Sequence, residues 1–284
     1  MQLTCVTATF NCIEAGNREG LVRCVESVAK LKTEHEHLVY DGASKDGTVE
    51  LLRELEKTTP GLKVVSERDS GIYNALNKGV RDAKGVWLYV LGSDDFVERP
   101  EVLDEIAAIN DCDAVATPVA WGSRVRQITL ENIFCGSPYC HQGVLQKTGL
   151  VRQYGGFDES YRISADYDLM LKFHEEARRI KYLDRQFAFF GDGGFTSTYK
   201  EEMNRDTAKI CAAHFGMALR AAERMVSSHV VPLSFASRYS SHPDYAFRVA
   251  AGQVPKTYFK NVLRMIFYPA VLARRHFIGK RRGY

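Results

Sequence analysis

The segment that decides the fold is 66-SERDSGIYNALNKGVRDAKGVWLYVLGSDD-95. Within it, small and apolar residues recur at helical spacing and predict a helix over Ile72–Lys84. The apolar run Val86–Leu91 follows directly and predicts a buried strand. Polar residues gather just before this helix, at Glu67–Gly71, and just after this strand, at Gly92–Asp95.

The same alternation of strand and helix fills the chain before this segment. The expected strands and helices are, in order, Leu3–Phe10, Gly20–Lys32, His37–Tyr40, Gly47–Lys57 and Lys63–Ser66. Such alternation implies right-handed crossovers and a mostly parallel sheet, so the fold class is α/β. Ligands of these sheets bind at the carboxyl ends of the strands. The polar clusters Thr7–Asn11 and Asp41–Asp46 fall at such ends.

The rest of the chain is less regular. Residues 111–165 are rich in Gly, Pro, Ser and aromatic residues, and helical spacing returns at Ala165–Ala177 and at 205–226. We find no clear linker before about residue 230. We therefore expect a catalytic domain over 1–230, with a nucleotide-binding half at about 1–110 and an acceptor-binding half at about 111–230. Residues 231–284 would form a C-terminal helical extension.

The charge is distributed unevenly along the 284 residues. The net charge is +3, but residues 256–284 carry eight Lys or Arg and no acid, which leaves residues 1–255 at −5. A strongly basic tail suggests contact with an anionic surface. The seven cysteines show no CxxC spacing, and the N-terminus reads as a strand rather than a signal peptide. These features predict a cytoplasmic protein.

The acid pair Asp94-Asp95 is the sharpest sign of chemistry. Two carboxylates that leave a buried strand together are costly unless a cation or a ligand offsets their charge. Mg²⁺ or Mn²⁺ bridging them to a diphosphate would do so, because both ions prefer oxygen ligands. The alternative is an exposed acidic turn before a helix that starts near Pro100.

Two other polar clusters allow a structural and a functional interpretation. Asp46 suits a turn and a helix cap, whereas Asp41 stands directly at a strand end, where an acid can bind a nucleobase or ribose. Asp69 or Ser70 could likewise cap the helix that follows them. The clusters are more informative together than singly.

In this order and spacing, the three clusters resemble family 2 glycosyltransferases of the GT-A fold, most closely the bacterial polysaccharide-assembly type. The matching segments are 41-DGASKDGT-48, 66-SERDSGIY-73 and the Asp-Asp motif after a strand. The resemblance spans residues 1–195 and implies a Rossmann-like sheet with flanking helices. It also implies hexosyl transfer from a nucleotide-sugar donor, with a UDP-sugar as the expected donor.

The resemblance implies roles for the donor-side residues. Thr9 and Asp41 would lie against the nucleoside, and Asp69 would contact the base or the ribose. Asp95 would be the principal ligand of Mg or Mn, and Asp94 would orient the sugar or the ribose. Gly92 departs from the Asn or Asp that many relatives carry, but the acid pair is intact.

On the acceptor side, the resemblance implies that Asp166 is the catalytic base, with Asp168 as the alternative. Many relatives have Glu-Asp where this chain has Ala165-Asp166. Asp166 also suits the first turn of a helix, where the dipole favours an acid. His141 would contact the acceptor or a phosphate, unless it is an ordinary loop histidine. Asp158 is expected to order its loop.

The tail combines basic residues with an apolar stripe at helical spacing. Its longest apolar run, Met265–Ala273, contains Pro269 and is too short to span a bilayer. An amphipathic basic segment can instead lie in the headgroup region of an anionic membrane. The alternative is a helix that packs on the catalytic domain.

Together these features predict a metal-dependent, inverting glycosyltransferase. It would act on a hydroxyl of a glycan or lipid-linked glycan, at the inner face of the cell membrane, without nucleic acid. A nucleotidyltransferase is the nearest alternative enzyme, but the glycine-rich, basic loop that binds a triphosphate is missing after the first strand. A membrane- or nucleic-acid-binding module is the alternative outside enzymes, and it leaves the acids at the strand ends unexplained.

Overall fold

The computed structural model describes residues 1–191 and 199–256. The chain divides into two compact units, here called unit 1 and unit 2. Unit 1 comprises Met1–Thr129 and Ser137–Asp206, and unit 2 comprises Leu130–Gly136 and the chain from Thr207 onward. This division falls earlier than residue 230, where we expect the catalytic domain to end. The assignment of functions to the domains remains a prediction.

Unit 1 contains a seven-stranded sheet of order β10-β6-β9-β4-β1-β2-β3. Its strands are β1 Leu3–Thr9, β2 His35–Asp41, β3 Leu62–Ser66, β4 Trp87–Val90, β6 Ala114–Ala116, β9 Val144–Lys147 and β10 Ile180–Tyr182. Strands β4, β1, β2 and β3 are parallel, and β9 is antiparallel to both β4 and β6. The predicted strands and their parallel arrangement are confirmed.

A second, four-stranded sheet of order β5-β11-β7-β8 lies in the same unit. Its strands are β5 Phe96–Val97, β7 Val119–Trp121, β8 Arg124–Arg126 and β11 Ala188–Phe190. Strands β7 and β8 fall in the segment 111–165 that reads as irregular, and the sequence did not predict them. Strands of two or three residues are too short to show a periodicity of two.

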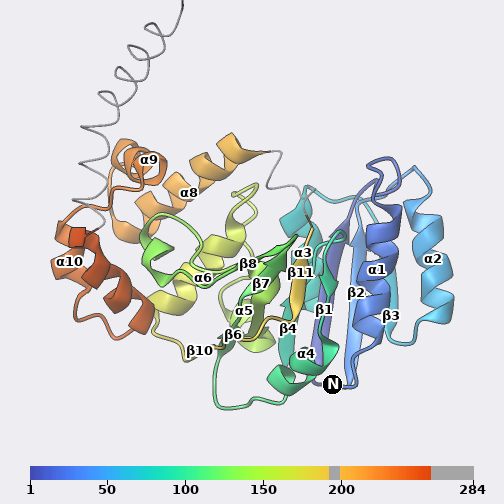
Figure 1. Cartoon of the computed structure of the whole chain (residues 1–284). Coiled ribbons are helices and arrows are strands. Elements are labelled where there is room, and N and C mark those ends of the chain that lie inside the picture. Colours follow the sequence, from blue (N-terminus) through green and yellow to red (C-terminus); the bar gives the residue numbers. More distant parts are fainter. Residues whose placement is uncertain (192–198, 257–284) are drawn as a thin grey trace, which may run out of the picture. The chain divides into compact units, whose positions relative to one another are not determined.

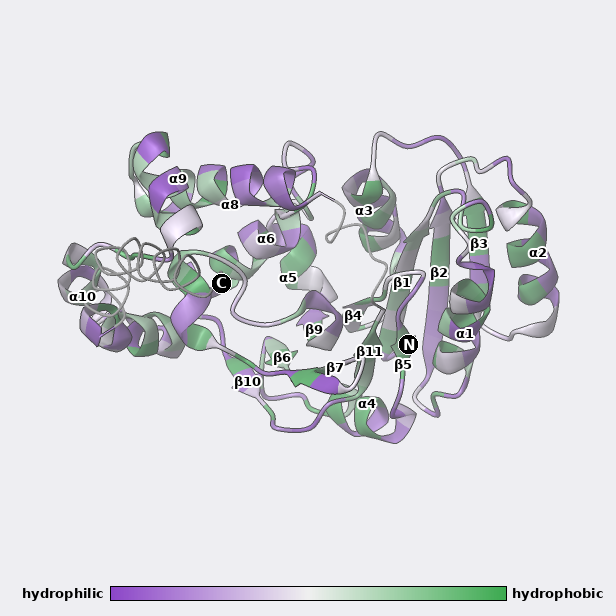
Figure 2. Ribbon diagram, turned by 45° about the horizontal axis from the view of Figure 1, so that its top comes forward, coloured by the Kyte–Doolittle hydropathy of each residue, from purple (hydrophilic) through white to green (hydrophobic). Residues whose placement is uncertain are grey.

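Helices cover both faces of the large sheet (Figure 1). The helices of unit 1 are α1 Arg18–Ala29, α2 Thr48–Thr58, α3 Ile72–Asp82, α4 Pro100–Ala107, α5 Thr148–Gln153 and α6 Ala165–Glu175. Helices α1 and α2 pack on one face through Leu21 and Leu52. Helices α3, α5 and α6 pack together on the other face around Val6, against which Gly79 of α3 lies so closely that an added Cβ would clash. Hydropathy follows this arrangement, since α1 and α2 each carry apolar and polar surfaces (Figure 2).

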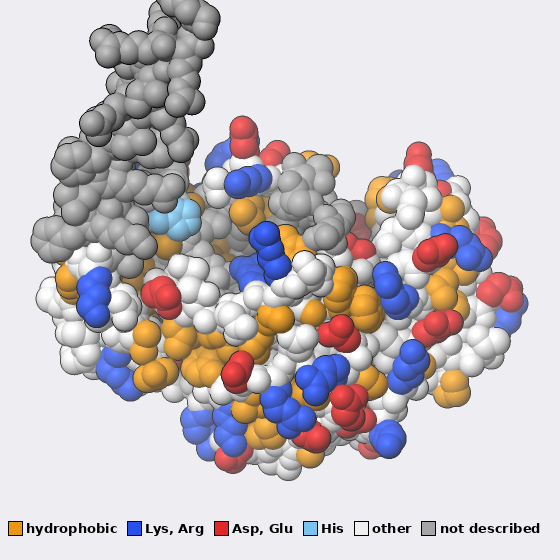
Figure 3. Space-filling view, viewed as in Figure 1, with side chains coloured by type: hydrophobic (Ala, Val, Ile, Leu, Met, Phe, Trp, Pro, Cys, Tyr) orange, Lys and Arg blue, Asp and Glu red, His pale blue; other side chains and the backbone are white. Residues whose placement is uncertain are grey.

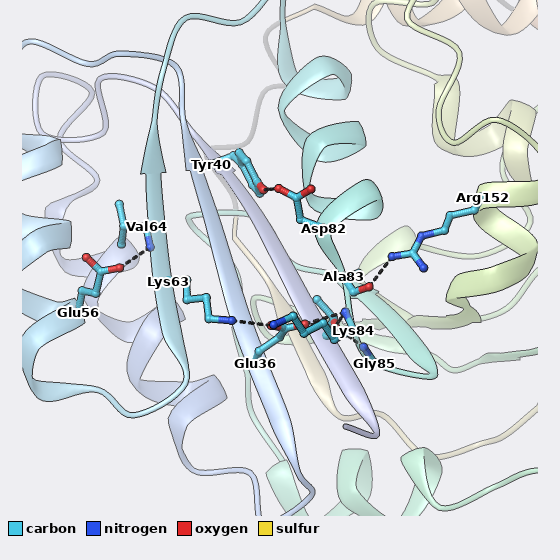
Figure 4. Close-up of polar contacts among 11 residues, drawn as sticks. Glu36, Tyr40, Glu56, Lys63, Val64, Asp82, Ala83, Lys84, Gly85 and Arg152 are labelled. Carbon is cyan, nitrogen blue, oxygen red and sulfur yellow. Dashed lines mark hydrogen bonds and ion pairs between the residues drawn. The ribbon is translucent and has the colours of Figure 1, made fainter.

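At the end of the sheet where β1 begins, a buried carboxylate joins neighbouring strands through hydrogen bonds. Glu36 of β2 is 1% exposed and accepts hydrogen bonds from Thr4 Oγ1, Lys63 Nζ and the Lys84 backbone (Figure 4). These bonds join β1, β2, β3 and the turn into β4. Because the acid has a partner for each of its oxygens, its burial here is explained by the fold. Ligands of a parallel sheet bind at the opposite end, where β1 and β4 end.

Helix α8, Lys200–Phe215, contains the division between the units, and α9 Leu219–Ser228 and α10 Ser234–Tyr239 follow it. We expected one helix over 205–226, and the structure has two. The break is at Gly216, whose φ of 63° is left-handed and ends a helix at little cost for glycine. In unit 2, aromatic side chains pack around the buried Phe134. The basic tail, 256–284, lies outside the described residues except for Lys256.

Candidate active site

A cavity of about 1140 Å³ lies at the carboxyl ends of β1 and β4 in unit 1. In Figure 1 the N-terminus marks the lower edge of the sheet, so these strands end at the upper edge. The lining includes four of the predicted donor-side residues: Thr9, Asp69, Asp94 and Asp95. Residues that are far apart in the sequence therefore meet where a parallel sheet binds ligands.

Asp95 is held in place by donors from three separate segments. Its carboxylate accepts the backbone N–H of Gly92 at 3.1 Å and of Gly191 at 2.8 Å, and the Gln142 side chain also donates to it. The residue is only 1% exposed. Gly191 has to be small here, because an added Cβ would lie 2.7 Å from the Asp94 carbonyl oxygen.

The charge state of the acid pair suits a cation. Burial, and then the neighbouring Asp94, raise the pKa of Asp95 to about 7, and burial raises the pKa of Asp94. A nearby divalent cation would stabilise both ionised carboxylates. Among the described residues, no group of three His, Cys, Asp or Glu is placed to hold a metal. Two carboxylates are fewer ligands than a hard cation takes, so an ion at Asp94 and Asp95 would need further oxygen ligands from outside this pair.

The two acids differ in their surroundings. Both Asp95 oxygens already accept backbone hydrogen bonds, whereas Asp94 is half-buried and lines the cavity. A carboxylate offers about four lone-pair sites, so Asp95 retains the capacity to bind a metal. Which acid is the principal ligand remains a prediction that separate substitutions can test.

Gln142 was not predicted, and it connects the acid pair to the buried core. Its Oε1 accepts from the Cys140 thiol at 2.9 Å, which leaves the amide nitrogen to donate to Asp95. Cys140 and Gln142 belong to the turn that precedes β9, and Gln142 follows Asp95 by 47 positions. A glutamine in an irregular segment carries no periodic signal, and only its position beside Asp95 reveals this role.

Asp41 lies behind the cavity wall rather than in it. The carboxylate is 1% exposed and accepts from Thr9 Oγ1, Ser44 Oγ, Ser66 Oγ and the Ser44 backbone N–H. Four donors from the chain itself occupy both of its oxygens. Asp41 therefore fixes the ends of β1, β2 and β3, and a direct contact with a nucleoside would have to replace one of these bonds.

Asp69 and the exposed ring of Phe10 meet above Gly42. A Cβ added to Gly42 would lie 2.9 Å from Asp69 Oδ2 and 3.1 Å from the Phe10 ring. Phe10 is 65% exposed, although it lines the cavity. Asp69 also accepts the Gly71 N–H at 3.0 Å, which fixes the turn into α3. An aromatic face beside a carboxylate suits a planar, hydrogen-bonding ligand such as a nucleobase.

Asp166 stands in the first turn of α6, with Tyr73 between it and the cavity. Tyr73 lines the cavity, and its hydroxyl lies 3.3 Å from Asp166 Oδ1 and 2.5 Å from the Ile163 carbonyl oxygen. Burial lowers the pKa of His141. The nearby charge of Asp166 raises this pKa by a smaller amount. His141 packs edge-on against Phe157, with ring centroids 5.5 Å apart.

Two other acids have structural partners. Asp168 is 4% exposed and forms an ion pair of 2.8 Å with Lys172 one turn later. Its acceptor-side role stays a prediction, as do those of Asp166 and His141, because all three residues lie outside the cavity lining. Asp158 accepts the Ser160 N–H at 2.9 Å, a bond that orders its loop.

The loop at 155–163 is fastened to α3 by Glu159, a second residue that we did not predict. Its carboxylate accepts from Asn77 at 2.9 Å, from Asn74 at 3.0 Å and from Ser70 at 3.3 Å. These bonds connect the donor-side turn at Ser70 with the loop that leads to Asp166. Asn74 and Asn77 lie on one face of α3, and Ser70 lies just before the helix; this spacing is a signal that could have indicated such a partner.

Comparisons with known proteins identify the family of this chain. The model of the family described as Glycosyl transferase family 2 matches residues 4–190. The PGL/p-HBAD biosynthesis glycosyltransferase of Mycobacterium tuberculosis is 27% identical over 194 residues, which cover 63% of this chain and 74% of that protein. Chondroitin synthase from Escherichia coli is 29% identical over 169 residues, covering 55% of this chain and 24% of the synthase.

Solved structures show the same fold. S. aureus TarS 1–349 in complex with UDP-GlcNAc has a TM-score of 0.63 at 17% identity, and the match covers 93% of this chain and 91% of that one. The mannosyltransferase PcManGT from Pyrobaculum calidifontis, in complex with GDP-Man and Mn²⁺, has a TM-score of 0.59 at 17% identity, covering 94% and 87%. The expected GT-A fold is thereby confirmed.

Proposed function

Because this chain belongs to glycosyl transferase family 2, we propose that it moves a hexose, with inversion, from a nucleotide-diphosphate sugar to a hydroxyl of a glycan or lipid-linked glycan. The observation that carries the proposal is the acid pair Asp94-Asp95 opening into a cavity that Thr9 and Asp69 also line. Family membership favours glycosyl transfer over nucleotidyl transfer and over a binding module.

The nucleobase and the diphosphate of the donor would bind at different sides of the cavity. The nucleobase would lie on Phe10 beside Asp69, on the scaffold that Asp41 and Thr9 form. The diphosphate would lie at Asp94 and Asp95, where a bound Mg²⁺ or Mn²⁺ would neutralise charge on the leaving group. TarS was solved with UDP-GlcNAc and PcManGT with GDP-Man and Mn²⁺, which supports a nucleotide-sugar donor, and we propose a UDP-sugar.

Asp166 is the proposed base. The acceptor oxygen attacks the anomeric carbon while the bond to the diphosphate breaks, and the hydroxyl proton passes to Asp166. Tyr73, whose hydroxyl donates chiefly to the Ile163 carbonyl oxygen and lies 3.3 Å from Asp166 Oδ1, positions this carboxylate behind the cavity wall. A single displacement of this kind inverts the anomeric centre. His141, beside Asp166, is proposed to contact the acceptor.

We also propose that the protein works at the cytoplasmic face of the cell membrane through the basic residues of 256–284. Within the described part of the chain, no helix is long and apolar enough to cross a membrane. The proposal rests on the charge and apolar pattern of the tail sequence.

The test is a panel of UDP- and GDP-sugars, assayed for hydrolysis with Mg²⁺, with Mn²⁺ and with EDTA. We expect one donor to be hydrolysed in the presence of metal, and NMR of the first-formed sugar to show an inverted anomeric centre. Activity that survives EDTA would refute the metal, and a retained configuration would refute the single displacement. Release of pyrophosphate from a nucleoside triphosphate would favour the nucleotidyltransferase instead.

A further inference from the structure

We propose that Trp121, Arg124 and Arg126, here called the rim row, bind the acceptor, and that this acceptor is a glycan carrying a phosphate. The inference rests on the proposed function, because it names the substrate class of the same site. The rim row lies on the β7–β8 hairpin of unit 1.

The rim row continues the wall of the cavity. Phe190, at the end of β11, lines the cavity, and its neighbour Gly191 donates to Asp95. Trp121 pairs with Phe190 in the sheet, and their ring centroids are 5.8 Å apart. Arg124 in turn pairs with Trp121. Two strand spacings, about 10 Å, therefore separate the backbone of Arg124 from that of Phe190.

The three side chains share one face of the small sheet. Arg126 pairs with Val119, which is buried, and Trp121 stands two residues after Val119 on the same face. The positive charge of Arg126 also reaches the buried Cys140, next to the turn that holds Gln142. Arg124 and Arg126 thus share the face of Trp121 and Phe190, while Val125 lies on the opposite face.

The chemistry of the rim row suits a sugar and an anion. Trp121 is 44% exposed and offers an aromatic surface to the apolar face of a sugar ring. Arg124 and Arg126 are exposed, and within residues 1–191 and 199–256 neither forms an ion pair with an acid. In Figure 3, Lys or Arg side chains adjoin hydrophobic ones over the region where Figure 1 places β7 and β8.

The spacing favours phosphate over carboxylate. Arg124 and Arg126 are two residues apart on a strand, about 7 Å, so one group with several oxygens can contact both. A single carboxylate would be satisfied by one guanidinium fork. The donor diphosphate proposed at Asp94 and Asp95 would repel a second anion inside the cavity. The rim row, outside the acids, allows a neutral sugar to enter while the phosphate stays at the edge.

Trp121 supplies a direct measurement of binding. The chain has two tryptophans, and the other, Trp87, is 0% exposed. We would titrate the full chain with chitobiose 1-phosphate, with methyl chitobioside and with a disaccharide of glucuronic acid and N-acetylglucosamine. The expected result is a change in tryptophan fluorescence with the phosphate at low micromolar to millimolar concentration, weakening as salt is added.

Variants of Arg124 and Arg126 test whether binding depends on the positive charge of these side chains. Arg124→Gln with Arg126→Gln should raise the Kd for chitobiose 1-phosphate by roughly tenfold or more, because charge-assisted bonds are lost, and leave methyl chitobioside unchanged. Lys at both positions should give an intermediate value, because it keeps charge but loses the fork. Val125→Thr, on the other face of β8, and Arg220→Gln, an exposed arginine of α9, are the matched controls. Trp121→Phe should remove the signal.

Three results would overturn the inference. One is the absence of any fluorescence response in the unmodified chain, and another is equal binding of the phosphate and its methyl glycoside. The third is tighter binding of the glucuronate disaccharide, which would refute phosphate as the preferred anion. Donor hydrolysis by the unmodified chain tests the proposed function separately. If the chain hydrolyses a donor but does not bind chitobiose 1-phosphate, the role of the rim row is refuted and the proposed function is not.

Discussion

At the scale of residues, Asp95 combines deep burial with hydrogen bonds from Gly92, Gly191 and Gln142. These bonds fix its direction, while burial, and then the adjacent Asp94, keep the pKa of Asp95 high. A protein that buries such a pair without a cation loses stability when both acids ionise. The free-energy cost of ionising two buried acids is the physical reason to expect that donor binding depends on a metal ion.

We expect Asp95→Ala to abolish transfer and metal-dependent donor binding while the fold persists, because the site then loses one of its two carboxylates. Calorimetry with Mn²⁺ and the donor nucleotide measures this, with Asp94→Asn as the comparison. If the Asp95 variant binds the metal and nucleotide with unchanged affinity and the Asp94 variant does not, the principal ligand is Asp94.

The raised pKa of Asp95 also predicts how stability depends on pH without metal. A carboxyl whose pKa is higher in the folded chain than in the unfolded chain stabilises the fold while it is protonated. This contribution is complete below about pH 4, the ordinary value, and is lost as the pH rises through about 7.

In EDTA, the wild type should therefore lose stability relative to Asp95→Asn between pH 5 and pH 8. Thermal melts of both proteins across this range give the comparison, and Mn²⁺ with nucleotide should reverse the loss at pH 8. Melting curves that stay parallel at every pH would show that Asp95 ionises as easily as an exposed acid.

Asp166→Asn should keep donor binding and lose transfer by at least ~10²-fold, since the amide cannot accept a proton. Tyr73→Phe should cause a smaller loss, because it removes only the hydroxyl that positions the carboxylate. Single-turnover rates and donor affinities separate the two effects. Near-normal turnover in Asp166→Asn would move the base role to Asp168 or another group.

At the scale of elements, the site depends on how closely the end of β11 approaches the turn after β4. Gly191→Ala would place a Cβ 2.7 Å from the Asp94 carbonyl oxygen and push these elements apart. We expect weaker binding of metal and nucleotide, with the melting temperature lowered by only a few degrees.

Gly149→Ala in α5 is the matched control, because its added Cβ would meet nothing within 4 Å. That change should leave binding unaffected and can stabilise the helix slightly. Equal nucleotide affinity in the two alanine variants would show that the Gly191–Asp95 contact has no part in the site.

At the scale of the whole molecule, the proposed membrane contact of 256–284 is separate from the catalytic chemistry. Deleting these residues should release the protein from anionic vesicles and leave donor hydrolysis largely unchanged. Basic residues near such a surface contribute about 1 kcal/mol each, and salt screens them, so binding should weaken steeply as ionic strength rises.

Vesicle co-sedimentation in increasing salt measures the release. A full-length variant with Arg274, Arg275, Arg281 and Arg282 changed to Gln is the control, since it keeps the apolar stripe. Full-length protein that stays in the supernatant at low salt, or a truncated protein that unfolds, would identify the segment as a structural helix instead.

The sequence by itself determined the parallel half of the large sheet and the acid pair. The helix at Ile72–Asp82 and the strand at Trp87–Val90 follow from residues within a few positions of one another. Helical spacing and apolar runs are local signals, so they can be read without the fold. The motifs at Asp41, Asp69 and Asp94 are also local, and they identified the family.

Only the tertiary structure decided which residues meet those motifs. Gly191 and Asp95 are 96 positions apart, and Tyr73 and Asp166 are 93 positions apart. It also decided that Asp41 supports the cavity from behind, because its four donors come from three strand ends. Contacts between distant segments depend on how the sheet twists and which loops cross it. A local pattern contains none of that information.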